Sequence, residues 1–403
     1  MRTVYLKGRS RGGPTHSLYR ELIRYPPEGY TVLTRKSLYK EQQSLSGLDK
    51  RQQLVYKVDR KLQDISLIRN IWYETKTLSY VCIKKAEKPH ALLESGADLV
   101  YCSQQLTFAK LPWIVDLEFA NALANYGDIR LIRRIVQKAL ASKYCKRILP
   151  WSDWAKRTLY RSLDCSALRD KIETLHFGIP PKRFVKKKTG DKLRILFVGS
   201  INLFNFLNFE WKGGFELIEA FQELNKRYDG VELVIRAWVP PEIMERCSSN
   251  PNIRILYSQL TEKALANLYE SSDIFLFPSH MNLGMAILEA MSYELPVITL
   301  NLYDIPEAVE DMKTGILIPP PPIPYYIWNG APNHYDRKLL FGIRHHRQWL
   351  VNQIVEKTSL LIENDSLRRR IGREARRSIE DGEFSIKKRN EKMKKIFDEA
   401  TQK

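Results

Sequence analysis

The stretch that decides the fold is Pro278-Ser-His-Met-Asn-Leu-Gly-Met-Ala-Ile-Leu-Glu-Ala-Met-Ser-Tyr-Glu-Leu-Pro-Val-Ile298. Residues 273–277, just before it, predict a strand, and residues 296–300 predict a second one. Between them a glycine turn leads into a short helix that we expect to end near Tyr293. A strand, a turn, a helix and a strand in this order form a βαβ unit. The backbone amides at the start of such a helix favour a bound anion.

Glu289 lies one turn inside this predicted helix. Its carboxylate is close enough to the helix start to accept hydrogen bonds from hydroxyls attached to a bound anion. A phosphate with a sugar on each side fits this arrangement. A buried βαβ unit without a ligand explains the same spacing, and from spacing alone that second interpretation is favoured.

Length and composition predict two soluble domains. The chain has 403 residues, of which 44% are apolar and 28% charged, which indicates folded domains of ordinary size. We expect no signal segment, because the first seven residues predict a strand. No apolar run approaches the roughly 20 residues of a spanning helix. The five cysteines form no Cys-x-x-Cys pair, so we expect reduced thiols in the cytosol and no zinc site.

The net charge of +19 is concentrated in one half of the chain. Residues 1–190 contain 37 Lys and Arg against 17 Asp and Glu, whereas residues 191–403 contain 28 against 29. A basic half indicates an anionic partner, either a nucleic acid or an acidic membrane surface. A generally lysine-rich surface would instead raise the net charge of both halves alike.

Predicted strands and helices alternate along both halves, which indicates parallel sheets covered on both faces. The first half predicts strands at residues 3–7, 31–34, 80–83, 99–102, 113–117 and 147–149 and helices at 17–24, 63–77, 129–142 and 152–162. The second half predicts strands at 193–198, 231–236, 253–256, 274–277 and 297–300, with further helices from about residue 345. The fold class is therefore α/β, with two doubly wound domains and a cleft between them.

A linker separates the two halves. Gly178-Ile-Pro-Pro181 and the basic run at residues 182–192 break the alternation. We therefore predict an N-terminal domain at 1–187, a C-terminal domain at 188–383 and a basic closing helix at 384–403.

The stretch from Pro278 resembles the donor-site signature of the family-4 glycosyltransferases, retaining enzymes of the GT-B fold. The shared pattern is Pro-Ser, a loop, glycine, four residues, then Glu-Ala-Met and Leu-Pro-Val. The resemblance implies that Glu289 holds the ribose of a nucleotide sugar, a UDP- or GDP-sugar. It also implies that the amides of Gly284, Met285 and Ala286 approach the pyrophosphate.

Other segments resemble the family in the same order along the chain. Arg11-Gly-Gly-Pro-Thr15 is similar to the first glycine loop, which implies that Gly12 and Gly13 let the backbone approach a phosphate. Leu193-Arg-Ile-Leu-Phe-Val-Gly199 followed by Lys212-Gly213 resembles the strand and phosphate-binding lysine of the C-terminal domain. The resemblance thus places Gly199, Ser200 and Lys212 at the donor site. It also implies that the closing helix crosses back to the N-terminal domain.

The departures from the family pattern concern three polar groups. Met281 stands where the family has a first glutamate, and the Pro-Ser loop is one residue short. His280 or Asn282 could substitute by hydrogen bonding. Ser200 stands where the family usually has an arginine.

No histidine follows the predicted strand at residues 113–117, so the polar candidates on the acceptor side are Asp116 and Glu118. At positions i and i+2 of a strand their side chains share one face and could contact acceptor hydroxyls. Capping of the following helix is an equally good interpretation.

Two aromatic segments have open roles. Residues 203–211 contain six apolar or aromatic side chains and could form a lid, a membrane wedge or a local core. Pro319-Pro-Pro-Pro322 favours an extended segment and is followed by Tyr325, Tyr326 and Trp328.

We expect a retaining, metal-independent glycosyltransferase that uses a nucleotide sugar, needs no other cofactor and transfers to a lipid-linked or glycan acceptor. No Asp-x-Asp pair lies in a plausible donor loop, so no catalytic metal is expected. The basic half predicts attachment to an anionic membrane at its cytoplasmic face, through the following residues: Lys57, Arg60, Lys61, Lys84, Lys85 and Lys88, with Ile71, Trp72 and Tyr73 inserting. The alternatives are a GT-B protein without catalysis and, with less support, a nucleic-acid-binding protein; we expect no nucleic-acid partner.

Overall fold

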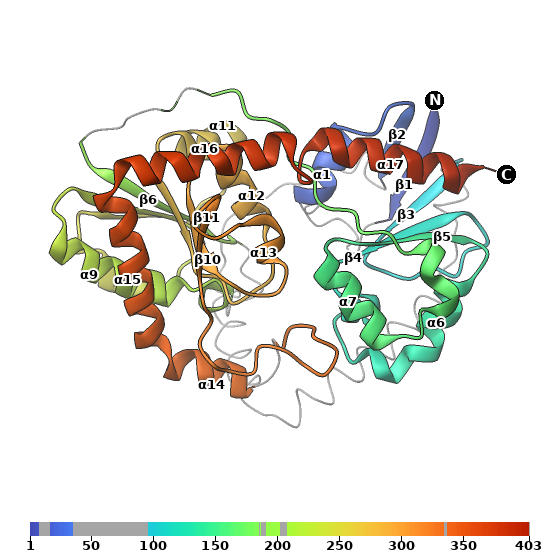
Figure 1. Ribbon diagram of the computed structural model, residues 1–403, viewed down its shortest axis with the longest axis horizontal. Coiled ribbons are helices and arrows are strands. Elements are labelled where there is room, and N and C mark those ends of the chain that lie inside the picture. The colour runs from blue at the N-terminus through green and yellow to red at the C-terminus, as the bar shows by residue number, and fades with distance from the viewer. Residues whose placement is uncertain are drawn as a thin grey trace. The chain divides into compact units, whose positions relative to one another are not determined.

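The computed structural model describes residues 1–7, 17–34, 96–184, 186, 191–201, 208–333 and 337–402. The chain divides into two compact units (Figure 1). Unit 1 comprises Met1–Phe177, Trp328–Ala331 and Lys387–Lys403, and unit 2 comprises Gly178–Ile327 and Pro332–Ile386. The division at residues 177/178 lies ahead of the predicted boundary at 187/188. The reason is that Ile179 exchanges backbone hydrogen bonds with Phe384 and Ile386, which draws the linker into unit 2.

Unit 1 contains a parallel sheet with the strand order β2-β1-β3-β4-β5. Its described strands are β1 Arg2–Lys7, β2 Tyr30–Thr34, β3 Leu99–Ser103, β4 Trp113–Leu117 and β5 Cys145–Pro150. Every residue of β3 and β4 is buried, as the near-continuous apolar runs predict. The predicted strand at 80–83 and helix at 63–77 lie outside the described residues.

The helices of unit 1 follow local sequence signals. They are α1 Ser17–Arg24, α6 Arg133–Ala141 and α7 Asp153–Ser162, with 3₁₀ turns η1 Ala120–Ala124, η2 Ile129–Ile132 and η3 Ser166–Lys171. The single helix predicted at 129–142 is therefore divided into η2 and α6. α7 starts where predicted because the Ser152 side chain accepts a hydrogen bond from the Ala155 amide, which satisfies one free donor of the first turn.

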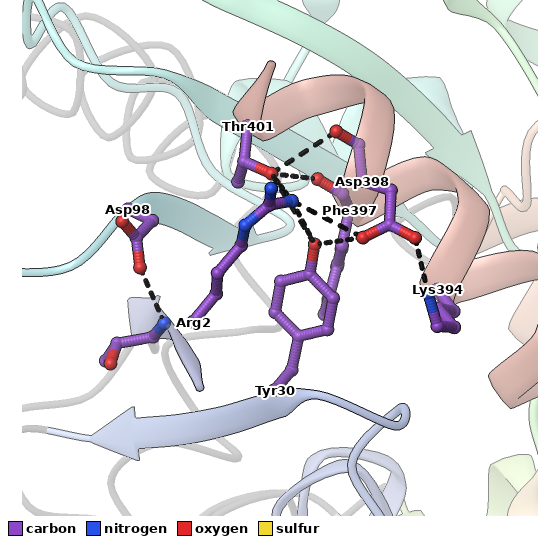
Figure 2. Close-up of polar contacts among 8 residues, drawn as sticks. Arg2, Tyr30, Asp98, Lys394, Phe397, Asp398 and Thr401 are labelled. Carbon is purple, nitrogen blue, oxygen red and sulfur yellow. Dashed lines mark hydrogen bonds and ion pairs between the residues drawn. The ribbon is translucent and has the colours of Figure 1, made fainter. Parts of the chain in front are cut away.

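The closing helix, α17 Ile386–Thr401, packs on the β1–β2 edge of the unit 1 sheet (Figure 2). The Tyr30 hydroxyl donates to Asp398 Oδ1 at 2.8 Å, and Arg2 Nη1 donates to Thr401 Oγ1 at 2.7 Å. The Tyr30 ring also meets the buried Phe397 ring edge to face, with the centroids 5.1 Å apart. The last sixteen residues of the described chain thus complete the core of the N-terminal sheet.

Unit 2 contains a parallel sheet with the order β11-β10-β9-β6-β7-β8. The strands are β6 Leu193–Val198, β7 Val231–Arg236, β8 Ile253–Leu256, β9 Ile274–Phe277, β10 Val297–Leu300 and β11 Gly315–Ile318. The first five have the predicted bounds, whereas the short β11 was not predicted. The chain builds outward from β6 to β8 and then resumes at β9 on the other side of β6. The topological switch point therefore lies between β6 and β9.

Helices cover the sheet of unit 2. They are α8 Asn208–Trp211, α9 Gly214–Arg227, α10 Pro241–Cys247, α11 Glu262–Glu270, α12 Met285–Ser292, α13 Ile305–Ala308, α14 Arg337–His345, α15 Arg347–Glu363 and α16 Asp365–Asp381. α15 packs against α9, and α16 against α12 (Figure 1). No helix in the described part of the chain is both long and apolar enough to span a bilayer.

The aromatic segment at 203–211 contributes to this core where it is described. The side chains of Phe209 and Trp211 are buried, and the Phe209 ring packs on the rings of Phe197 and Phe215. Residues 202–207 lie outside the described residues.

Candidate functional site

The carboxyl ends of β9, β6 and β7 lie next to one another in the sheet of unit 2. In open parallel sheets, ligands bind outside the carboxyl ends of the strands at the topological switch point. β6 is followed there by Gly199 and Ser200, β7 ends at Arg236, and β9 leads into the loop at residues 278–284. The predicted donor-site residues of unit 2 follow these strand ends.

Lys212 is placed by the glycine that follows it. Gly213 has φ +73°, and a Cβ atom there would lie 2.2 Å from the Pro278 carbonyl oxygen, so only glycine allows this close approach. The Lys212 Nζ atom lies 5.9 Å from the centroid of the Phe277 ring at the end of β9. Burial, and to a smaller extent the neighbouring Arg236 charge, lower the pKa of Lys212 to about 8. No acidic side chain in the described ranges forms an ion pair with Lys212, which makes this ammonium available to an anion.

The second anion-binding element is the start of α12. Gly284 precedes this helix in an extended conformation, with φ −102° and ψ 150° and with open space around it. The amides of Met285 and Ala286 lie in the first turn, where an α-helix offers no backbone acceptor. The preceding loop is held by Leu283, whose amide donates to Asp304 Oδ1 at 2.7 Å. These amides and the partial positive charge of the helix favour a phosphate.

Glu289 lies one turn further into α12 and is half-buried. The Tyr269 hydroxyl donates to its Oε2 atom at 3.2 Å, and the Tyr269 ring stacks on Tyr293 with the centroids 5.2 Å apart. The stacking fixes the ring that orients the carboxylate. The Glu289 charge also acts on Arg236, whose pKa is lowered by burial and partly raised again by Tyr269 and Glu289.

His280 does not replace the missing first glutamate. Its ring is fully buried, with Nδ1 2.8 Å from the Tyr325 hydroxyl and Nε2 4.0 Å from Glu216 Oε1. Glu216 is fully buried as well, and burial raises the pKa of its carboxyl to about 7, although Arg347 opposes the shift. The histidine therefore belongs to an internal network that ties Tyr325, from the proline-rich segment, to α9.

In unit 1, Asp116 lies at the carboxyl end of β4 and is buried. Its carboxylate accepts hydrogen bonds from the Tyr19 hydroxyl at 2.9 Å, the Tyr101 hydroxyl at 3.0 Å and the Gln104 amide at 2.8 Å. Burial nevertheless raises the pKa of Asp116 to about 6. A carboxyl group with such a pKa can hold or release a proton near neutral pH.

Glu118 lies just beyond β4, and the Tyr126 hydroxyl donates to its Oε2 atom at 2.7 Å. The same hydroxyl lies 2.8 Å from Gln104 Oε1, so Gln104 joins Glu118 to Asp116 in one network. Gln104 and Tyr126 both have positive φ values, 51° and 65°, which residues other than glycine rarely adopt. The capping alternative is not supported, because the N-cap of η1 is Phe119 and no side chain caps it.

The structure thus describes nine of the eleven predicted site residues. Gly12 and Gly13 lie outside the described residues. Arg236, Gln104 and Tyr126 were not predicted. The available signal for Arg236 was a charged residue ending the apolar strand Val-Glu-Leu-Val-Ile-Arg at the edge where ligands bind.

Residues 192–324, which contain the whole site of unit 2, match the family model described as Glycosyl transferases group 1. This part of unit 2 is therefore similar to a glycosyl transferases group 1 domain. The capsular polysaccharide biosynthesis glycosyltransferase CapM of Staphylococcus aureus is 26% identical over 177 residues, which cover 42% of this chain and 38% of CapM. The matched segment is therefore well under half of that relative.

Two solved structures resemble nearly the whole chain. A glycosyltransferase from Rickettsia africae is 16% identical with a TM-score of 0.59, over 100% of this chain and 98% of that one. HepE of Anabaena, solved with UDP and glucose, is 15% identical with a TM-score of 0.57, over 99% of each chain. Together with the two parallel-sheet units, these similarities confirm the predicted GT-B fold around the group 1 domain.

Proposed function

We propose that the protein is a glycosyltransferase that moves a sugar from a UDP- or GDP-sugar to a hydroxyl group of a glycan or lipid-linked acceptor, with retention of the anomeric configuration. The observation that carries this proposal is Lys212. It is a cation without an acidic partner in the described ranges, at the switch point of a group 1 domain. The names of the similar proteins support a nucleotide-sugar donor, since HepE was solved with UDP and glucose.

Each donor-site group has a defined task in this reaction. The bond between the anomeric carbon and the phosphate oxygen breaks, and negative charge develops on the departing diphosphate. Lys212 and the amides of Met285 and Ala286 stabilise that charge, because preorganised donors interact most strongly where charge develops. Glu289, oriented by Tyr269, accepts hydrogen bonds from the ribose hydroxyls.

Unit 1 holds the acceptor in this proposal. Asp116 and Glu118 lie in one network at the carboxyl ends of β3 and β4, next to the switch point between β1 and β3. Glu118 contacts the acceptor hydroxyl, and Asp116 orients the network around it. In this proposal Gly12 and Gly13, which follow β1 in the sequence, contribute backbone contacts to the donor phosphates.

Donor binding is tested by a thermal-shift panel of nucleotides and nucleotide sugars, followed by calorimetry on the best ligand. We expect Lys212→Met and Glu289→Gln each to weaken binding about tenfold to a hundredfold, since a hydrogen bond to a charged group is worth about 1.5–3 kcal/mol. Lys263→Met, at an exposed lysine of α11, is the matched control and should bind like wild type. If no nucleotide stabilises the wild-type protein, the proposal is wrong.

Retention and metal independence rest on the family resemblance and need separate tests. We expect the product to keep the anomeric configuration of the donor sugar, measured by the proton coupling constant of the anomeric hydrogen. We expect transfer to continue at an unchanged rate in excess chelator. An inverted product or a chelator-sensitive rate would remove the corresponding part of the proposal.

A donor-binding protein without catalysis is the second candidate, favoured by the saturated carboxylate of Asp116. Both oxygens of this side chain already accept hydrogen bonds within unit 1. Incubation of the wild-type protein with its best nucleotide sugar separates the two candidates. Release of nucleotide and free sugar, even slowly, supports the enzyme, whereas tight binding without release supports the binder.

We also propose that the protein works at the inner face of the cell membrane, bound to anionic lipids. The residues predicted from the sequence, 57–88, lie outside the described residues. In the described part, residues 130–147 include seven Lys and Arg and no acidic side chain, and two of the seven, Arg130 and Arg147, form ion pairs with Asp128 and Glu399 outside the segment. The exposed Leu131 and Trp328 accompany them, with the Arg130 guanidinium 5.2 Å from the Trp328 ring centroid. Exposed basic and apolar groups together suit an anionic bilayer surface.

Liposome sedimentation tests this attachment. We expect binding to anionic vesicles at low salt, release at high salt and no binding to neutral vesicles. Charge reversal at Arg133 and Arg134 should reduce binding, whereas the same change at Arg369 and Arg370, both exposed on α16, should not. Equal binding to anionic and neutral vesicles would refute the electrostatic mechanism.

A further inference from the structure

We propose that Arg236 binds the phosphate attached to the ribose of the donor. This inference deepens the proposed function and rests on it. It names a binding residue on β7, a strand that carries none of the predicted site residues. Three observations in unit 2 support it.

The first observation is the position of Arg236. β6 and β7 pair in parallel with Val198 opposite Arg236, and the Gly199 amide donates to the Arg236 carbonyl at 2.8 Å. The Arg236 Nη1 atom in turn donates to the Gly199 carbonyl at 3.3 Å. The guanidinium is therefore held over the carboxyl end of β6, beside Ser200.

The second observation is that the Arg236 guanidinium has few hydrogen-bond partners. The Arg236 Nε atom is buried and has no hydrogen-bond partner, and none of the acidic groups in the described ranges forms an ion pair with Arg236. A guanidinium has five N–H donors, and one weak contact to a carbonyl leaves most of them unsatisfied. The residue is half-buried, so part of the guanidinium stays in water, but the buried Nε–H is costly to leave without an acceptor. A bound phosphate oxygen would supply that acceptor.

The third observation is the neighbourhood of the charge. Arg236 lowers the pKa of Lys212, so the two cations are close enough to repel each other. Arg236 also interacts electrostatically with Glu289 and Tyr269, whereas Lys212 does not. Arg236 is thus the cation that interacts with both the lysine and the glutamate. If Glu289 holds the ribose, we expect Arg236 to bind the phosphate next to the ribose and Lys212 to bind the outer phosphate.

A ligand series separates these assignments. Calorimetry measures the affinities of uridine, UMP and UDP for the wild-type protein and three variants. The guanosine series is used instead if the thermal shifts select it. We expect Arg236→Gln to weaken the binding of the monophosphate and of the diphosphate about tenfold or more and to leave the affinity for the nucleoside unchanged. Lys212→Met should weaken only the diphosphate. Arg254→Gln, at an exposed arginine on β8, is the matched control and should change nothing.

Unchanged monophosphate affinity in Arg236→Gln, with wild type binding phosphates more tightly than nucleoside, overturns this inference and leaves the proposed function intact. An equal loss for all three ligands also overturns it, because it shows that the arginine only shapes the pocket. No nucleotide binding by wild type overturns the proposed function itself. If Arg236→Gln is unstable, Arg236→Lys can replace it. The lysine keeps the positive charge but cannot donate two parallel hydrogen bonds as a guanidinium does, so phosphate affinity should fall by an intermediate amount. Adding Ser200→Arg to Arg236→Gln should restore phosphate binding.

Discussion

Raising the pH should weaken diphosphate binding through Lys212. The pKa of this lysine is lowered from 10.5 to about 8, so at pH 9 only about one free-protein ammonium in ten remains charged. A bound diphosphate favours the charged form and returns the pKa toward its ordinary value. Binding at pH 9 then includes the uptake of a proton, which costs about 1.4 kcal/mol, or about tenfold in Kd, relative to pH 7.

Calorimetry between pH 7 and pH 9 measures this effect, with Lys212→Arg as the control. The arginine stays charged over the whole range, and the ionisation of the ligand affects both proteins alike. The ratio of the wild-type Kd to the Lys212→Arg Kd should therefore rise about tenfold. A ratio that stays constant would refute the argument.

The stability of the unliganded protein should increase over the pH range in which diphosphate binding weakens. Because the folded pKa lies below the unfolded one, unfolding takes up a proton, and stability should rise by about 3 kcal/mol as the pH rises from 8 to 10.5.

Three further predictions concern buried groups. The pKa of Glu216 is raised from 4.5 to about 7, so its ionisation removes stability as the pH rises across that window, and Glu216→Gln should raise the melting temperature at pH 8 but not at pH 4.5. Asp116→Asn keeps one acceptor oxygen for three donors and should cost about 1–3 kcal/mol in urea denaturation; a neutral result would show that the network tolerates an open donor. Gly213→Ala should destabilise by at least about 1–2 kcal/mol and weaken donor binding, because of its left-handed φ and the contact with the Pro278 carbonyl. Gly230→Ala, with open space around it, should do neither.

The sequence predicts the fold of unit 2 well because its signals are local. Short apolar strands and the glycines at turns fix β6 to β10 and place Lys212 and Gly284 at the starts of helices, where the structure has them. β11 was missed because four residues beside a proline run have no periodicity of their own. Its place depends on pairing with β10, which is a tertiary interaction.

Two parts of the candidate sites could not be predicted, for a common physical reason. Arg236 is 37 residues from Gly199 along the chain, and only the pairing of β6 with β7 brings them together. The sequence predicted that Asp116 could contact acceptor hydroxyls, but it did not reveal that Tyr19 and Tyr101, from two other elements, hydrogen-bond to this buried carboxylate. Burial of a charge depends on partners distant in sequence, and one chain without its fold does not reveal them.

The return of α17 to unit 1 has a consequence for biosynthesis. In chain order, both segments of unit 2 lie between Phe177 and Lys387 of unit 1, with the short unit 1 segment Trp328–Ala331 between them. During translation every residue of unit 2 emerges before Met393, Ile396 and Phe397, which are buried in unit 1. The ribosome therefore delivers all five described strands of the unit 1 sheet long before the helix that covers the edge of that sheet. Unit 2 can reach its native state on the nascent chain, whereas unit 1 must wait, with apolar surface exposed, until synthesis has passed its last helix. A chaperone should accordingly engage the N-terminal half throughout elongation, and a nonsense mutation after residue 386 should leave a folded C-terminal unit attached to an N-terminal one that never closes.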